Sequence, residues 1–231
     1  MITVNNILKV YNGNTVVNIP QLEAREGEIV GLVGNNGAGK TTFFRLLLDL
    51  VRADKGEIFS RDRDVALTED WKQYTAAYLD EGFLISYLTP EEYFYFVGSL
   101  HGLSRAQVDE FLQGFESFFD GSILNSGKYI RDLSKGNQFK AGITACLLQD
   151  PQVLVLDEPF ANLDPSSQMR LIKILKEIQT RRRLLIFVSS HDLNHVTDIC
   201  NRILLMEKGR IIKDIDTTAD TLQELEHYFS V

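Results

Sequence analysis

The sequence has few cysteines and no long apolar run, and both shortages limit what the protein can be. Only Cys146 and Cys200 occur among 231 residues, far apart and each beside apolar residues. This is neither a disulfide framework nor a metal-ligand spacing, which favours a reducing, cytosolic setting. No apolar run approaches the ~20 residues that a membrane-spanning helix needs. The N-terminus has no charged segment followed by an apolar core, so we expect no signal peptide.

Basic residues are outnumbered by acidic ones, 24 to 32, which gives a formal net charge of -8. The only basic cluster, residues 181–183, follows a helical stretch and is expected to be a solvated helix end. This balance argues against an extended nucleic-acid surface, and we expect no nucleic-acid partner. The remaining composition, 44% hydrophobic and 24% charged, is that of a globular protein. The length suits one large domain or a core with an inserted lobe.

A glycine-rich segment carries the strongest functional signal. It matches the phosphate-binding pattern G-x-x-x-x-G-K-[ST]. The glycines let consecutive backbone N–H groups surround a phosphate chain, a lysine places its charge on the β- and γ-phosphates, and a threonine hydroxyl ligates Mg²⁺. The segment lies between an apolar run typical of a buried strand, residues 28–33, and a predicted helix, residues 42–48. We therefore predict a nucleotide site at Gly34, Asn35, Asn36, Gly37, Ala38, Gly39, Lys40, Thr41 and Thr42.

The rest of the chain alternates between strand and helix patterns. Short β-like runs divided by turn signals fill residues 1–33. Apolar runs at 153–156 and 184–188 are typical of central parallel strands, and an amphipathic helix is predicted at 166–180. This alternation predicts an α/β fold with a parallel sheet.

A helical block interrupts the alternation and is interpreted as an inserted lobe, at about residues 82–137. Thr89, Pro90 and the two acids that follow are typical of a helix start. The aromatic run 93–96 has two interpretations: lobe core, or partly the lining of a groove for another chain, since adjacent helical residues point about 100° apart.

Asp157 and Glu158 end one of the apolar strands. Asp157 is placed to hold Mg²⁺ beside the glycine-rich loop, and Glu158 to act as a general base on the attacking water. A capped strand end explains the Asp-Glu pair alone equally well.

Further motifs follow in one order, and together they make the whole chain resemble the ATP-binding cassette (ABC) ATPases. Residues 133–138, Leu-Ser-Lys-Gly-Asn-Gln, resemble the ABC signature Leu-Ser-Gly-Gly-Gln, and residues 162–165, Asn-Leu-Asp-Pro, resemble the D-loop. His191 resembles the switch histidine, and Tyr11 the aromatic residue that stacks on adenine. The resemblance implies a P-loop NTPase (RecA-like) core at 1–81 and 138–231, with an N-terminal antiparallel β subdomain and the helical lobe inserted.

The resemblance also implies roles for these residues, with ATP and Mg²⁺ as cofactors. Ser134, Gly136 and Asp164 would engage ATP held by a second subunit, so that two domains enclose two nucleotides. Ser134 and Gly136 suit an anion because they stand at a helix N-terminus. His191 would hydrogen-bond the γ-phosphate. Helix capping or a surface position remains the alternative for His191, and strand packing for Tyr11.

Two departures from the family pattern stand out. Lys135 and Asn137 replace the usual glycine and glutamine of the signature. In the loop that joins the core to the lobe, Glu81 stands where the family has a glutamine, with Asp80 beside it. A carboxylate there can still bind Mg²⁺, so Glu81 is the third predicted metal ligand after Thr41 and Asp157.

Together these patterns predict the cytoplasmic ATPase subunit of a transporter, paired with a second ABC ATPase subunit as a homodimer or heterodimer. The transmembrane permease would be a separate chain that holds the ATPase at the inner face of the membrane. The lysine in the signature, the Asn-Leu-Asp-Pro segment and the short tail most resemble drug or ABC-2 type exporter ATPases. The alternative is a soluble ABC ATPase that acts in assembly of a cytosolic protein or iron–sulfur complex. A P-loop kinase or GTPase is disfavoured because no Asn-Lys-x-Asp guanine motif occurs.

Overall fold

The computed structural model describes residues 1–230, and the side chains of Glu81, Phe229 and Ser230 lie outside the described part. The strands are β1 (Ile2–Tyr11), β2 (Asn14–Ala24), β3 (Ile29–Val33), β4 (Lys55–Ser60), β5 (Arg63–Asp64), β6 (Thr75–Tyr78), β7 (Val153–Leu156), β8 (Leu185–Ser190), β9 (Arg202–Glu207) and β10 (Arg210–Asp216). The α-helices are α1 (Lys40–Leu47), α2 (Pro90–Leu100), α3 (Arg105–Gln113), α4 (Glu116–Phe119), α5 (Lys135–Leu148), α6 (Pro165–Arg182), α7 (Leu193–Ile199) and α8 (Thr221–Ser230). Three 3-10 turns are η1 (Asp70–Gln73), η2 (Glu81–Phe83) and η3 (Ile130–Asp132).

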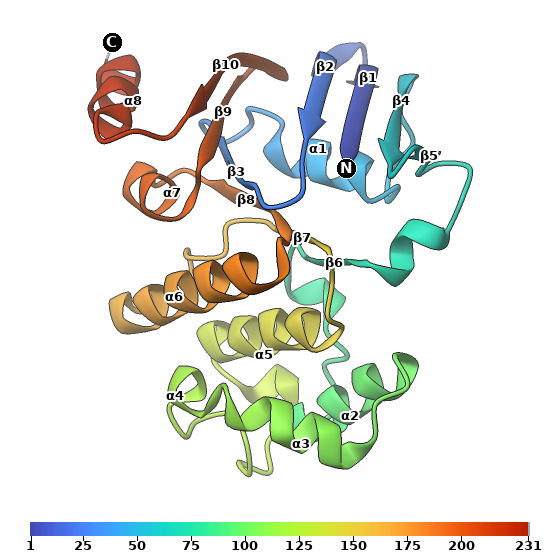
Figure 1. Ribbon diagram of the computed structural model, residues 1–231, viewed down its shortest axis with the longest axis vertical. Coiled ribbons are helices and arrows are strands. Elements are labelled where there is room, and N and C mark those ends of the chain that lie inside the picture. Colours follow the sequence, from blue (N-terminus) through green and yellow to red (C-terminus); the bar gives the residue numbers. More distant parts are fainter. Residues whose placement is uncertain (231) are drawn as a thin grey trace.

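Two sheets form the upper part of the molecule in Figure 1. One is antiparallel, with the strand order β2-β1-β4-β5. The other has the order β10-β9-β3-β8-β7-β6, and all its pairs are parallel except β10 with β9. The predicted α/β fold with an N-terminal antiparallel subdomain is confirmed. Because β3, β7 and β8 are parallel neighbours, their carboxyl ends meet at one edge, where ligands of such sheets bind.

The parallel strands are buried on both faces, and each face has its own core. Along β3, Ile29 and Val33 face the cluster that includes α5, α6 and the lobe, whereas Val30 and Leu32 face the cluster around α1 and the antiparallel sheet. Strands covered on both sides are continuous apolar runs, as the sequence shows. The edge of the parallel sheet at which the carboxyl ends of its strands meet is therefore supported by a core on each face.

The helical lobe lies at the opposite end of the molecule from β1, β2 and the C-terminus (Figure 1). Its first helix, α2, begins with a capping box in which Thr89 accepts from the N–H of Glu92 and the carboxylate of Glu92 accepts from the N–H of Thr89. The predicted helix start is confirmed. The predicted boundary between lobe and core, at 137 and 138, falls within the first turns of α5, which packs against both α2 and β6.

The lobe-core interpretation of the aromatic run 93–96 holds for two of its residues, and the lining of a groove for another chain stays a prediction. The side chains of Tyr93 and Phe94 are buried, and the Phe94 ring stacks on Phe119 with centroids 6.0 Å apart. Phe96, by contrast, is 43% exposed. The two sets point in different directions because successive residues of a helix are about 100° apart.

The cysteines, the basic cluster and the apolar runs can be compared with the structure. Cys146 and Cys200 are free and buried. The arginines of residues 181–183 are exposed at the end of α6, where Arg183 adopts a left-handed conformation with φ of 52°. Within residues 1–230, no helix is long and apolar enough to cross a membrane.

Candidate nucleotide-binding site

The glycine-rich loop connects β3 to α1, as predicted. Gly39 stands just before the helix with φ of 108°, a conformation that side-chain-bearing residues rarely adopt. A Cβ atom at Gly39 would also lie 2.5 Å from the carbonyl oxygen of Val16. The N-terminus of α1 opens onto a cleft of about 220 Å³. The backbone N–H groups at a helix N-terminus favour binding of anions. The residues that line the cleft are Val16, Asn36, Gly37, Ala38, Gly39, Lys40, Thr41, Thr42 and Glu158.

Lys40 provides the positive charge of this cleft. The residue is only 6% exposed, and its Nζ donates a hydrogen bond to the carbonyl oxygen of Gly34 at 2.7 Å. The same Nζ lies 3.4 Å from Oε1 of Glu158. A buried ammonium group held at the start of α1 is suited to the β- and γ-phosphates of a nucleotide, as the sequence predicts.

Glu158 connects Lys40 to His191. Its Oε2 lies 2.8 Å from Nδ1 of His191 and accepts from the backbone N–H of His191 at 3.3 Å. Glu158 has a left-handed backbone with φ of 48°, which costs about 1–3 kcal/mol for a residue with a side chain. Such conformations gather at functional sites, where they aim a side chain. The predicted base and the predicted switch histidine are thus in direct contact.

Oxygen donors gather beside the loop, at the end of β7. The Thr41 hydroxyl donates to Oδ2 of Asp157 at 2.5 Å, and the Ser189 hydroxyl donates to Oδ1. Carboxylate and hydroxyl oxygens are the ligands that Mg²⁺ prefers. Two of the three predicted metal ligands, Thr41 and Asp157, therefore lie together in a set that fits this ion.

Ser189 is a residue of this site that the sequence reasoning missed. It is fully buried at the end of β8, and its Oγ also accepts from the N–H of Glu158 at 2.8 Å. One hydroxyl thus orients both acidic residues. The sequence does show a polar residue at the end of an apolar strand. That this residue contacts Asp157 and Glu158 follows only from the pairing of β8 with β7.

We expect Ser189→Ala to lower the rate of ATP hydrolysis by about 10- to 100-fold, because partners that orient a metal-binding carboxylate have effects of this size. The Mg²⁺ concentration that gives half-maximal rate should rise, which titration of the ATPase rate with Mg²⁺ will show. Ser190→Ala is the matched control, since the Ser190 hydroxyl accepts from the N–H of Asp192 and, among the described residues, has no hydrogen bond to Asp157 or Glu158. Equal rates for the two variants would contradict the role assigned to Ser189.

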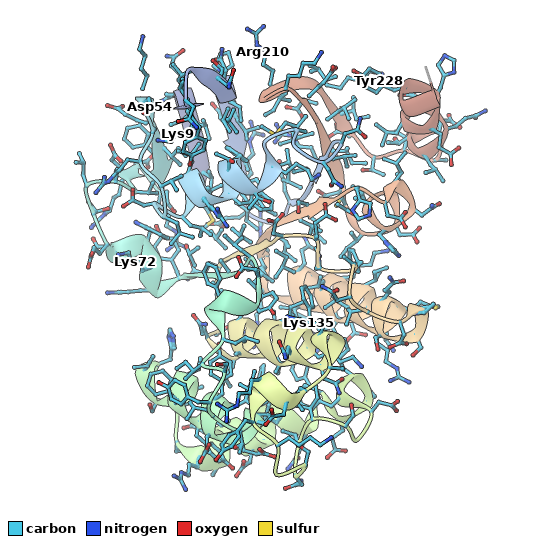
Figure 2. The ribbon with its side chains drawn as sticks, turned by 180° about the vertical axis from the view of Figure 1, so that it is seen from behind. Lys9, Asp54, Lys72, Lys135, Arg210 and Tyr228 are labelled. Carbon is cyan, nitrogen blue, oxygen red and sulfur yellow. The ribbon has the colours of Figure 1, made fainter. Side chains whose placement is uncertain are left out.

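The signature segment lies at the N-terminus of α5 and does not line this cleft. Ser134 caps the helix by accepting from the N–H of Asn137 at 3.3 Å, and Lys135, labelled in Figure 2, is exposed in the first turn. A Cβ atom at Gly136 would lie 2.7 Å from the carbonyl oxygen of Asn162. Within this chain, Gly136 thus permits close contact with the D-loop; its predicted approach to a phosphate stays a prediction.

Asp164 and Tyr11 also lie outside the cleft lining. The Asp164 carboxylate caps α6 by accepting from the N–H and hydroxyl groups of Ser166 and Ser167. These hydrogen bonds hold the pKa of the Asp164 carboxyl well below its usual range. Tyr11 is 44% exposed at the end of β1, with Nζ of Lys9 5.1 Å from its ring centroid. Contact of either residue with a nucleotide stays a prediction.

The loop that carries Asp80 and Glu81 leads into η2. Oδ1 of Asp80 accepts from the N–H of Gly82 at 2.7 Å, and Oδ2 lies 3.9 Å from Arg45. Asp80 therefore has a local structural contact, and its exposed ion pair contributes little to stability. The Glu81 side chain lies outside the described residues, so its predicted contact with Mg²⁺ stays a prediction.

We expect Glu81→Gln to remain active with an altered Mg²⁺ dependence, because it keeps the hydrogen-bonding shape and removes one negative charge from the metal site. Glu81→Ala should lose much of the ATPase activity, whereas Asp80→Ala should change it little. Steady-state rates across a Mg²⁺ titration will separate the three variants. If Asp80→Ala lowers the ATPase rate and Glu81→Ala does not, the predicted metal-binding role would belong to Asp80 and not to Glu81.

Comparison with known proteins now places the chain in a family. The model of a family described as ABC transporter matches residues 17–161. The chain belongs to the ABC transporter family. A further model, described as an AAA domain, matches residues 127–197. The uncharacterized ABC transporter ATP-binding protein YhcH of Bacillus subtilis is 28% identical, over 99% of this chain and 74% of its own length. The protein MJ1023 of Methanocaldococcus jannaschii, with the same description, is 30% identical over 91% of this chain and 76% of its own length.

Solved ABC structures share the fold. An ATP-binding subunit of an ABC transporter has a TM-score of 0.84 at 25% identity, covering 98% of this chain and 93% of that one. The ATP-binding cassette MJ0796, solved as a dimer in a post-hydrolysis state with ADP and Pi, has a TM-score of 0.82 at 20% identity, covering 95% and 100%. This chain is accordingly an ABC transporter ATP-binding subunit.

The predicted exporter type is not confirmed, since related ABC proteins include the methionine import protein MetN of Geobacillus kaustophilus, 30% identical over 92% of this chain and 65% of its own length.

Proposed function

We propose that this ABC subunit hydrolyses ATP in a Mg²⁺-dependent reaction and thereby drives transport through a separate membrane permease. One observation carries the proposal: the Glu158 carboxylate lies between the Lys40 ammonium group, at 3.4 Å, and the His191 ring, at 2.8 Å. A phosphate-binding cation, a base and a hydrogen-bonding imidazole in contact are the parts that hydrolysis of a γ-phosphate requires.

The proposed chemistry follows from these contacts. Lys40 and the backbone N–H groups of the loop bind the triphosphate chain and neutralise charge that develops on the β- and γ-phosphates. Glu158 accepts a proton from water as the water oxygen bonds to the γ-phosphorus and the bond to the β-phosphate oxygen breaks. His191 holds the carboxylate and contacts the γ-phosphate. Thr41 and Asp157 would hold Mg²⁺, which would supply further neutralisation of the phosphate charge.

The second part of the proposal is a paired arrangement of two ATPase subunits. Ser134 and Gly136 belong to the chain's predicted ATP-binding set, yet neither lines the cleft that holds Lys40 and Glu158. If Ser134 and Gly136 contact the nucleotide held by a second subunit, their position outside the cleft of their own chain is explained. The dimer reported for MJ0796 supports such pairing.

The third part is a permease that binds the lobe and keeps the subunit at the cytoplasmic face of the membrane. Large apolar side chains are exposed on and beside the lobe, although most residues of this size are buried. Backbone hydrogen bonds join residues 86 and 88 to residues 130 and 131, so the segments that carry Tyr87 and Tyr129 lie side by side. Exposed apolar groups that gather in one region mark binding surfaces. The exposed apolar side chains on and beside the lobe are those of Phe83, Tyr87, Phe96, Leu100 and Tyr129. We propose export as the direction, on the signature lysine and the D-loop sequence.

Purification of the tagged chain from detergent-solubilised membranes tests the proposal. We expect co-purification of a membrane protein with several spans and an ATPase rate that requires Mg²⁺. Phe96→Glu with Leu100→Glu should abolish co-purification without altering the ATPase rate of the isolated chain. Leu67→Glu, at a residue 82% exposed outside the lobe, is the matched control. Recovery of soluble proteins alone would instead support the assembly-factor alternative.

A further inference from the structure

His195 is a second histidine beside the proposed site, and the proposed reaction does not use it. It lies on α7, four residues after His191, and its side chain is 19% exposed. Its ring packs against the Phe160 ring, with centroids 4.8 Å apart and planes tilted by 33°. Phe160 is buried and comes two residues after Glu158, in the segment that leads to the D-loop. His195 therefore contacts the chain between the proposed base and the D-loop.

Two hydrogen bonds join His195 to the same segment through Gln168, in the first turn of α6. Nε2 of Gln168 donates to the carbonyl oxygen of Phe160 at 2.9 Å, and Oε1 of Gln168 lies 3.2 Å from Nε2 of His195. A carbonyl oxygen can only accept, so the amide nitrogen of Gln168 must face Phe160 and its oxygen must face the ring. Nε2 of His195 therefore carries the hydrogen of this bond. The contact joins α7 to α6, which are neighbours in the fold (Figure 1).

The other ring nitrogen shows that packing alone does not explain a histidine at this position. Nδ1 of His195 lies 3.4 Å from Oδ2 of Asp192 but is not aligned with it for a hydrogen bond. Among the described residues this buried nitrogen has no other partner. A buried polar atom without a partner lowers stability, and phenylalanine would pack against Phe160 without this loss. The contact that needs a polar side chain is the hydrogen bond to Gln168.

Two histidines thus contact the two ends of one short segment. His191 contacts the carboxylate of Glu158, with 2.8 Å between Nδ1 and Oε2. His195 contacts Phe160 directly and the first turn of α6 through its hydrogen bond. Asp192 caps the N-terminus of α7 between the two histidines, so both belong to one ordered segment. A shift of His195 relative to Phe160 would therefore move Glu158 relative to His191.

We propose that His195 is a positioning residue whose hydrogen bond to Gln168 fixes residues 158–168 relative to α7. This inference rests on the proposed function, in which Glu158 accepts a proton from water. Without the hydrogen bond, Glu158 keeps its basic group but loses its fixed position relative to His191 and to the water. Misplacement of the base would slow hydrolysis without weakening binding of ATP to the P-loop.

His195→Phe tests the inference, because it keeps a ring against Phe160 and removes the hydrogen-bond donor. We expect kcat for ATP hydrolysis to fall about tenfold with KM unchanged, while the melting temperature changes little. His195→Gln should restore most of kcat, because its amide nitrogen can replace Nε2 as the donor to Gln168. His101→Phe, at an exposed position after α2, is the matched control. A parental kcat in His195→Phe, no recovery in His195→Gln, or a melting temperature that falls in step with kcat would overturn the inference.

Hydrogen exchange tests the same contact without ATP turnover. In His195→Phe, backbone exchange should accelerate in residues 158–168 and stay at the parental rate in the P-loop. Gln168→Met removes the partner in the same bond, so adding His195→Phe to it should cause no further acceleration. If the parent chain does not hydrolyse ATP, the proposed function fails while the exchange result still decides the inference. Parental exchange in residues 158–168 of His195→Phe would overturn the inference alone.

Discussion

Lys40→Ala should abolish detectable ATP hydrolysis, with a loss of about 10²-fold or more in rate. The variant removes the charge that neutralises the β- and γ-phosphates, and electrostatic groups aimed at the reacting phosphate dominate phosphoryl transfer. In the structure Nζ of Lys40 lies 3.4 Å from Glu158, so the variant also removes the cation beside the proposed base. Binding of a fluorescent ATP analogue and release of phosphate, both measured on the purified chain, will show the loss.

Two controls make this result specific to the loop. Lys72→Ala removes a lysine that is exposed and paired with Glu69, and it should leave both measurements unchanged. Circular dichroism of Lys40→Ala will show whether the fold survives loss of the buried side chain, whose Nζ also satisfies the carbonyl oxygen of Gly34. Near-normal turnover by a folded Lys40→Ala variant would refute the assignment of the P-loop.

Glu158→Gln should leave ATP affinity equal or higher and lower hydrolysis by roughly 10²-fold or more. The amide keeps the shape of the side chain but cannot accept a proton from water, so the loss falls on the transition state. ATP affinity does not suffer because the substitution also removes the Glu158 charge that lies 3.4 Å from Lys40 and competes with phosphate. The ATP-bound variant should accumulate as a dimer, measured by size-exclusion chromatography in the presence of ATP and Mg²⁺.

The matched control for Glu158→Gln is Glu177→Gln, the same chemical change on the surface of α6, where Glu177 pairs with Lys173. We expect parental hydrolysis and no ATP-dependent dimer from this control. If Glu158→Gln hydrolyses ATP as fast as the parent, another group activates the water. His191→Ala, which removes the ring in contact with Glu158, is then the next variant to measure.

Features that depend on neighbouring residues in the chain were predictable from the sequence. The P-loop is a contiguous segment whose strand, glycines and helix start act within a dozen residues. β3 lies within the predicted strand at 28–33, and α1 begins two residues before and ends one residue before the predicted helix at 42–48. The start of α2 was predictable for the same reason, since a capping box involves only Thr89 and Glu92. The alternation of apolar strands and amphipathic helices was enough to predict the α/β class.

Features that depend on which elements become neighbours required the tertiary structure. Ser189 orients Asp157 and Glu158 only because β8 pairs with β7 in the register that sets Val188 opposite Leu156. The sequence alone determined the glycine-rich loop, the carboxylate predicted to bind Mg²⁺ and the family resemblance, because these are local patterns. The tertiary structure decided how the acidic residues are oriented and how the signature contacts the D-loop, because those contacts join residues far apart in the chain.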